Sequence, residues 1–287
     1  TAGKTPTLIK GNLNSAAFYQ QQLHTHMPAG IVSVDFSQAK SSEHVIASLS
    51  ALHRANIPAK GIIRANIEDN RTFGWLERDD VAGLRLYAKP DMPNLRQNKA
   101  QWDKLFSMLR YYKKHLCVFG VAKHTRPLIA QLPNDIPILM DHLGAFGIDE
   151  GTNHHQYAQL LSLLCARYKA GQPIYFKGPG YRTSFTPHKT AAFLLKIIEL
   201  FGESQIMLGA SDAPFAGQVV EKTGHYAGLQ NHQVIGYDSL LDYLNSLIKV
   251  IASQCDKSFE MLQMQLLYSN AQRFYQFDET DIKKAAT

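Results

Sequence analysis

Short apolar runs recur along the chain, and most are followed by a longer stretch with helical spacing of its apolar residues. The runs are rich in Val, Ile, Leu and Phe without strict alternation, which is typical of strands buried on both faces of a sheet. They lie at residues 31–36, 61–64, 83–87, 116–121, 136–141, 174–178 and 206–210. The pattern therefore predicts seven buried strands.

Helical spacing predicts helices between these runs and after the last of them. One is predicted to begin at Thr186-Pro187, where an N-cap residue precedes proline at the first helical position. The predicted helices cover residues 14–26, 42–55, 101–114, 153–170 and 187–201, followed by 237–252, 258–265 and 267–275.

Strands that alternate with helices indicate an α/β protein with a parallel sheet covered by helices. A doubly wound sheet could hold seven strands, whereas a closed (β/α)8 barrel needs eight. The chain begins with a predicted helix, so a barrel whose first strand lies upstream of Thr1 fits both observations. We predict a (β/α)8 TIM-like barrel, its first strand missing from this sequence, as one domain over residues 1–287. Its C-terminal segment, about 237–280, is predicted to be helical.

Composition and charge limit the classes of molecule that the protein is expected to bind. The chain has 287 residues, 45% hydrophobic and 19% charged, and a net charge of +6, but its Lys and Arg never form a run of five or six. This favours a globular protein with a small-molecule substrate over a nucleic-acid binder. No apolar stretch approaches the roughly 20 residues of a membrane span. We expect a cytoplasmic protein that can form a homo-oligomer. Its three cysteines, Cys117, Cys165 and Cys255, are expected to be reduced and buried as small apolar residues.

Ionisable residues follow several of the apolar runs directly. Ligands of parallel α/β folds bind at the carboxyl ends of the strands, so these residues are candidates for a site. A single one more often caps or braces a loop, but the set suggests a site assembled from several strand ends. Its ionisable members are Asp35, Arg64, Arg85, Tyr87, Lys89, Lys123, His124, Asp141, His142, Lys177, Tyr181, Arg182 and Asp212. The polar residues Ser37, Asn66 and Ser211 belong to the same set.

These side chains suit hydrolysis of an ester-like carbonyl. Asp212 could act as general base on water or as a metal ligand, and His142 could polarise a carbonyl or bind a metal. Arg85 and Arg182 could clamp a carboxylate or phosphate. A decarboxylase or hydratase would fit the same residues.

Three other motifs carry less weight. Residues 24–26 read His-Thr-His, but on a helix positions i and i+2 point in different directions, so we expect a helix end there. Residues 3–5 read Gly-Lys-Thr but lack the upstream glycine and strand of a phosphate-binding loop. His154 and His155 open a predicted helix and are expected at the surface.

Four segments resemble, in order, the landmarks of the amidohydrolase-related family of (β/α)8 hydrolases, and within it the 2-pyrone-4,6-dicarboxylate lactonases. They read ILMDHLG, IYFKGPGYRTS, IMLGASDAPF and LLYSNAQRFYQF. The resemblance implies that Asp212 activates the hydrolytic water and that His142 polarises the scissile carbonyl. In metal-binding relatives these positions would ligate zinc, so we expect either no cofactor or one zinc ion. Arg85 and Arg182 would contact substrate carboxylates, with Tyr87, Lys89, Tyr181 and His124 as further substrate-binding candidates.

The chain also departs from the family pattern. The family's first strand ends in His-x-His, and no such strand is found here. The lactonase has arginines where this chain has Ala145 and Asp91, and a histidine where it has Phe215. Fewer cations argue for a substrate with one carboxylate, or a sugar lactone, rather than a dicarboxylate. A zinc-dependent decarboxylase or hydrolase and a catalytically decayed small-molecule binding protein stay open as alternatives.

Overall fold

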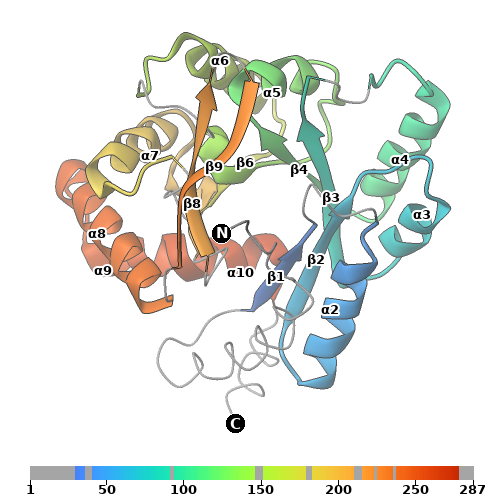
Figure 1. The fold of residues 1–287 in the computed structure, drawn as a ribbon, viewed down its shortest axis with the longest axis horizontal. Coiled ribbons are helices and arrows are strands. Elements are labelled where there is room, and N and C mark those ends of the chain that lie inside the picture. Colours follow the sequence, from blue (N-terminus) through green and yellow to red (C-terminus); the bar gives the residue numbers. More distant parts are fainter. Residues whose placement is uncertain are drawn as a thin grey trace. The chain divides into compact units, whose positions relative to one another are not determined.

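A computed structural model describes residues 30–35, 41–90, 94–145, 151–178, 183–209, 215–222, 225–234 and 237–277. Strands and helices alternate over this part of the chain (Figure 1). Residue contacts divide the chain into two compact units. The first comprises Thr1–Arg85, Ser107–Lys114 and Ala271–Thr287, and the second Leu86–Phe106 and His115–Asn270. The single domain expected over residues 1–287 stays a prediction.

The first unit contains a parallel sheet with helices beside it. The sheet order is β1 (Ile31–Val34), β2 (Ala59–Arg64) and the first part of β3 (Val81–Ala88), with Val34 opposite Ile62 and Arg64 opposite Arg85. Its helices are α2 (Glu43–Arg54), α3 (Asn70–Leu76), the end of α4 (Lys99–Tyr111) and most of α10 (Asn270–Tyr275).

Helix α2 packs closely on β2 because Gly61 leaves space for two of its side chains (Figure 1). A Cβ at Gly61 would lie 2.8 Å from Leu49 Cδ1 and 3.0 Å from Val45 Cγ1. Both of these side chains are fully buried, as are Ile62 and Ile63 on the strand. The apolar face of α2 and the apolar run of β2 thus form the core of this unit.

The second unit continues with parallel strands. Its strands are β4 (His115–Gly120), β5 (Ile138–Met140), β6 (Ile174–Lys177) and β7 (Ile206–Met207), which neighbour one another in that order. The register places Val118, Met140, Phe176 and Ile206 in one row across the four strands. All four are buried, as expected for strands covered on both faces.

Helices follow these strands, and an antiparallel hairpin follows β7. The helices are α5 (Ala122–Ile129), α6 (His155–Lys169), α7 (Pro187–Phe201), α8 (Tyr237–Cys255) and α9 (Phe259–Met264). Short helical turns are η1 (Asp141–Gly144), η2 (Glu203–Gln205) and η3 (Gln265–Ser269), and the hairpin is β8 (Phe215–Lys222) with β9 (His225–Val234). In the described part of the chain, no helix is long and apolar enough to cross a membrane.

All seven expected strands are present, and the α/β class with parallel strands is confirmed. Three elements were not expected: α3, α5 and the β8–β9 hairpin. Helix α5 is short and contains Pro127, which removes a backbone donor and opposes helix formation. The helix expected at residues 14–26 lies outside the described residues. Thr186 and Pro187 begin α7, and His154 precedes α6, as predicted.

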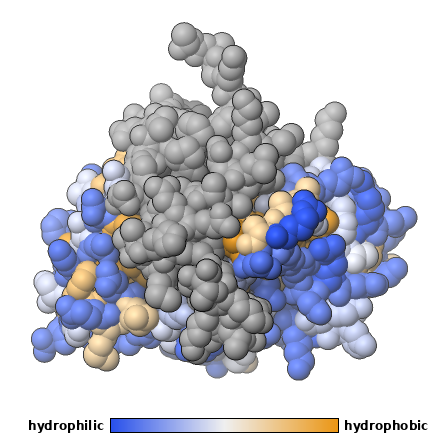
Figure 2. All heavy atoms as spheres, turned by 90° about the horizontal axis from the view of Figure 1, so that it is seen from below, coloured by the Kyte–Doolittle hydropathy of each residue, from blue (hydrophilic) through white to orange (hydrophobic). Residues whose placement is uncertain are grey.

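The described surface is mainly polar. Figure 2 shows hydrophilic residues over most of the described part of one face, with small apolar areas between them. The three cysteines are free thiols, Cys117 buried and the other two half-buried.

Candidate active site

The turn after β5 has a left-handed backbone. His142 has φ 48° and ψ 42°, Leu143 has φ 61° and ψ 12°, and Gly144 continues with φ 65°. A left-handed conformation costs roughly 1–2 kcal/mol for each residue with a side chain, and only glycine adopts it freely. His142 and Leu143 therefore hold a strained conformation that the surrounding structure must stabilise.

Hydrogen bonds stabilise this turn from within and from α6. The backbone N–H of His142 donates to Asp141 Oδ1 at 3.0 Å, and the N–H of Ala145 donates to the His142 carbonyl at 3.1 Å. The hydroxyl of Tyr157 donates to the Leu143 carbonyl at 3.3 Å. Burial raises the pKa of Tyr157 well above its usual value, so this hydroxyl keeps its proton.

Gly178, directly after β6, lies against the backbone of His142. A Cβ at Gly178 would come within 3.0 Å of His142 Cα and 3.3 Å of its backbone nitrogen. Gly178 also has φ +149°, and its N–H donates to the Met207 carbonyl at 3.1 Å. Only glycine allows this close approach, which brings the ends of β5, β6 and β7 together around His142.

Two charges meet beneath the turn. Lys177 Nζ lies 2.8 Å from Asp141 Oδ1, and the side chain of Asp141 is only 1% exposed. His142 Nε2 lies 3.8 Å from the same oxygen, and the histidine is itself buried. Asp141 thus braces the turn and pairs with a cation from the next strand. The pairing with Lys177 was not foreseen.

Aromatic rings extend this group towards the end of β3. The rings of Phe119 and His142 meet edge to face, with centroids 5.4 Å apart, and Phe119 meets Tyr87 in the same way at 5.8 Å. Lys89 Nζ lies 5.6 Å from the centroid of the Tyr87 ring, within the range of a cation–π contact. The structure therefore links Tyr87 and Lys89 to His142 through Phe119.

The first unit holds a second buried polar group at the ends of β1 and β2. The side chain of Asp35 is fully buried and accepts hydrogen bonds from Ser42 Oγ at 2.8 Å and from Arg64 Nε at 3.2 Å. Ser42 Oγ in turn accepts the backbone N–H of Arg64 at 2.8 Å. His44 Nε2 lies 3.8 Å from Asp35 Oδ1. The serine does not contact the histidine, so this set is not a nucleophilic triad.

Arg85 lies beside this group on β3. It is the register partner of Arg64, and residues opposite each other in a sheet project from the same face. Arg85 is buried, whereas the side chain of Arg64 is about a quarter exposed at 23%. Two guanidinium groups on neighbouring strands make this face a candidate for binding an anion.

His124 and Ala145 are further positions considered in the sequence that the structure describes. His124 lies half-buried in the first turn of α5 instead of following a strand directly. Ala145 is fully buried, so it replaces the family's arginine with a residue that belongs to the core. Asp212, Tyr181 and Arg182 lie outside the described residues.

The described residues do not fit a zinc site. A catalytic zinc ion needs three protein ligands, and among these residues no three His, Cys, Asp or Glu side chains cluster suitably. Asp141 is engaged by the ammonium of Lys177, which would repel a second cation.

Comparisons with known proteins connect the chain to solved structures only. No family model matches it, and no curated protein matches it by sequence. A probable 2-pyrone-4,6-dicarboxylic acid hydrolase from Acinetobacter baumannii, solved with citric acid, is 16% identical with a TM-score of 0.68. That alignment covers 91% of this chain and 89% of the other.

Two further structures have the same fold. A putative 2-pyrone-4,6-dicarboxylic acid hydrolase from Pseudomonas putida is 21% identical with a TM-score of 0.65, covering 91% of this chain and 87% of the other. An amidohydrolase from Burkholderia multivorans with bound zinc is 12% identical with a TM-score of 0.62, covering 91% and 88%. At the level of fold, the expected resemblance is confirmed: the chain has the (β/α)8 architecture of these amidohydrolases.

Proposed function

We propose that the protein is a hydrolase that opens a lactone or similar cyclic ester of a small carboxylated or hydroxylated molecule. The observation that carries this proposal is the strained turn at His142, fixed by Gly178, Asp141 and Lys177 at the strand ends. Strain of this kind persists at functional sites because the surroundings maintain it. The solved structures with the same fold are named as hydrolases, which supports the same class of reaction.

Asp212 is the general base in this proposal. It takes a proton from water, and the water oxygen attacks the ring carbonyl to form a tetrahedral intermediate. His142 donates a hydrogen bond to the developing oxyanion. The ring C–O bond then breaks, and the leaving oxygen takes the proton back from Asp212. The product carries one new hydroxyl and one new carboxylic acid, which ionises and releases its proton to solvent.

The positively charged side chains among the candidate site residues favour an anionic substrate. Arg85 and Arg182 are assigned to its carboxylate, Lys89 and Tyr87 to its other polar groups, with Tyr181 and His124 as further candidates. The structure from Acinetobacter baumannii has citric acid bound, which supports a ligand that carries a carboxylate. The buried Ala145 here lacks the positive charge of the lactonase position, so we assign a substrate with one carboxylate or a sugar lactone.

Two alternatives predict different behaviour. A zinc-dependent decarboxylase or hydrolase draws support from the zinc in the structure from Burkholderia multivorans. A binding protein without turnover would agree with the missing cations. The first requires about one zinc ion per active chain, and the second requires binding without product.

A lactone panel tests the proposal. The full-length protein is offered six-membered lactones with one or two carboxylates and sugar lactones, and ring opening is followed by proton release. We expect turnover of a monocarboxylate or sugar lactone, at least 100-fold slower in Asp212→Asn, since loss of a general base removes about 10²–10⁴ in rate. Asp242→Asn, an exposed carboxylate on α8, is the matched control and should behave as wild type. Equal turnover by wild type and Asp212→Asn would remove Asp212 from the mechanism.

Metal content and activity together distinguish the proposed hydrolase from the zinc enzyme and from the binding protein. Zinc is measured on the same preparation, and activity is compared before and after chelation. Full activity with substoichiometric zinc excludes the zinc enzyme, and catalysis at a useful rate excludes the binding protein.

A further inference from the structure

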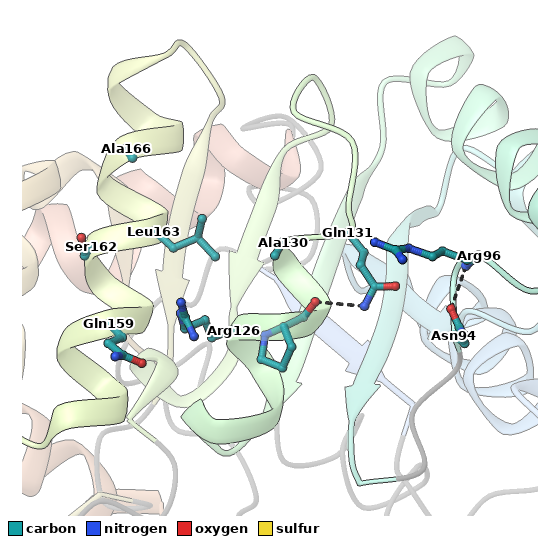
Figure 3. A pocket seen from close by; sticks show the side chains of 10 residues that line it. Asn94, Arg96, Arg126, Ala130, Gln131, Gln159, Ser162, Leu163 and Ala166 are labelled. Atoms are coloured by element: carbon teal, nitrogen blue, oxygen red, sulfur yellow. Dashed lines mark hydrogen bonds between the residues drawn. The ribbon is translucent and has the colours of Figure 1, made fainter.

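We propose that the second unit carries a separate binding site for a small organic dianion, in the hollow between α5 and α6. The hollow has a volume of about 910 Å³, within the range of small-ligand sites, and is shown in Figure 3. Its lining shares no residue with the strand-end group around His142. The proposed hydrolase activity does not use it.

Helical periodicity creates the two walls. On α6 the lining residues Gln159, Ser162, Leu163 and Ala166 follow the i, i+3, i+4, i+7 spacing of one helix face. The other side of α6 is fully buried, as Leu160 shows. Arg126 and Pro127 of α5, with Ala130 and Gln131 directly after it, form the facing wall. Asn94 and Arg96 from the segment before α4 lie at one side (Figure 3).

Positive charge dominates the lining. Arg96 and Arg126 both line the hollow, and no Asp or Glu does. Two other arginines of the described chain do have a nearby carboxylate: Arg71 pairs with Asp69, and Arg78 with Asp80. No such partner lies within ion-pair distance of Arg96 or Arg126 among the described residues. Two guanidinium groups without carboxylates favour an incoming anion with two charged groups.

The uncharged lining suits the rest of such a ligand. Asn94 Oδ1 accepts the backbone N–H of Arg96 at 3.0 Å, which fixes the turn that presents this arginine. Gln131 Nε2 donates to the Pro127 carbonyl at 3.0 Å, so its amide is held against the α5 wall (Figure 3). Leu163 is half-buried and supplies an apolar surface. A compact carbon skeleton between two carboxylates, or a diphosphate, matches this lining.

Arg126 also has a simpler structural role. It lies in the last turn of α5, where a cation interacts favourably with the helix dipole. That role predicts a small loss of stability on substitution and no effect on any ligand. Measurements of binding and of stability on the same variant therefore separate the two roles.

The test uses citrate as the carboxylate probe and inorganic pyrophosphate as the phosphate probe. Each is titrated into the full-length protein by calorimetry at about 50 mM and 200 mM salt, because screening weakens exposed charge pairs. We expect saturable binding of one probe, weaker at the higher salt, and at least tenfold weaker in Arg96→Gln/Arg126→Gln. Arg54→Gln removes an exposed arginine on α2 and is the matched control, expected to bind as wild type.

Leu163→Glu gives a second, independent variant. It places a carboxylate in the hollow while keeping both arginines, so it should also abolish binding, and its melting temperature shows whether it folds. Tighter binding of citrate assigns a ligand with several carboxylates, and tighter binding of pyrophosphate assigns a diphosphate. Absence of saturable binding by wild type, or unchanged affinity in the folded double variant, would overturn the proposal. Lactone hydrolysis is measured separately, so a failure of this binding site can be distinguished from a failure of the proposed hydrolase activity.

Discussion

Lys177 Nζ and Asp141 Oδ1, 2.8 Å apart, join the ends of two neighbouring strands by a largely buried ion pair. The same carboxylate oxygen accepts the N–H of His142 at 3.0 Å. Asp141 Oδ1 thus pairs with the ammonium group at the end of β6 and orients the turn that follows β5. The position of the His142 imidazole therefore depends on both strands. The pair of Lys177 and Asp141 is the first that we propose to mutate.

Replacing Lys177 by Met should destabilise the protein strongly. The substitution leaves the Asp141 carboxylate buried without its cation, which typically costs about 3 kcal/mol or more. Urea unfolding at pH 7 gives the change in the free energy of unfolding. Lys177→Met/Asp141→Leu should lose less than the sum of the single changes, because it leaves no unpaired charge. Lys196→Met, which breaks an exposed pair with Glu199, is the control and should cost below about 1 kcal/mol. If the losses in the free energy of unfolding of the two single variants simply add in the double variant, Lys177 and Asp141 are not energetically coupled.

Gly178→Ala should distort the turn at His142. The new Cβ would lie 3.0 Å from His142 Cα, so one of the two backbones must shift, at a cost of about 1–3 kcal/mol. We expect a large fall in kcat for lactone hydrolysis from the fraction that stays folded. Gly171→Ala is the matched control, since it has φ +97° but nothing within 4 Å of the added Cβ. It should lose stability through backbone strain while keeping its kcat. Equal falls in kcat would show that the contact with His142 is unimportant.

Ser42→Ala tests the polar group at the end of β1. Ser42 Oγ donates to the buried Asp35 carboxylate and accepts the N–H of Arg64, so its removal leaves two groups short of a partner. We expect a loss of about 1–3 kcal/mol in the free energy of unfolding. Ser50→Ala is the control: its hydroxyl donates only to the Ile46 carbonyl one helical turn earlier, so it should be nearly neutral. A Ser42→Ala protein as stable as Ser50→Ala would contradict this role.

Periodicity made the strands and most helices predictable, because buried parallel strands are continuous apolar runs and their helices have one apolar face. It failed for α5, where Pro127 and charged residues hide a short buried face, and for the β8–β9 hairpin, whose strands lack a clear apolar run. These elements depend on contacts that a local pattern does not encode.

The candidate site was predictable only as a set of residues. His142 and Asp141 stood out because ionisable groups followed an apolar run. The left-handed backbone of His142 has only a weak sequence signal, since few residues other than glycine adopt it, even though histidine is enriched among those few. Phe119 looked like any other strand residue, and the pairing of Lys177 with Asp141 depends on how β6 lies beside β5. Site residues follow from local chemistry, whereas their partners follow from register.

Lys114 should make stability depend on alkaline pH. Burial lowers its pKa to about 8, although the nearby Asp79 and Asp80 act in the opposite direction. Its Nζ donates to the carbonyls of Arg78 at 2.5 Å and Val81 at 2.6 Å, contacts that a neutral amine can still make. The folded protein therefore loses this proton more readily than the unfolded chain, whose lysine keeps a pKa near 10.5.

The sign of the effect follows from proton binding. Between about pH 8 and pH 10.5 the unfolded chain holds more protons at Lys114 than the folded protein, so this group's contribution to stability rises with pH in that window. Below pH 8 both states are protonated, and the contribution is at its lowest and constant. Lys114→Met lacks the titration and also removes one donor from each of the two carbonyls, an effect that does not change with pH. Urea unfolding of both proteins at pH 7, 8, 9 and 10 should therefore show a stability difference that moves in favour of wild type above about pH 8. A difference that stays constant over this range would show that the ammonium keeps its ordinary pKa in the fold.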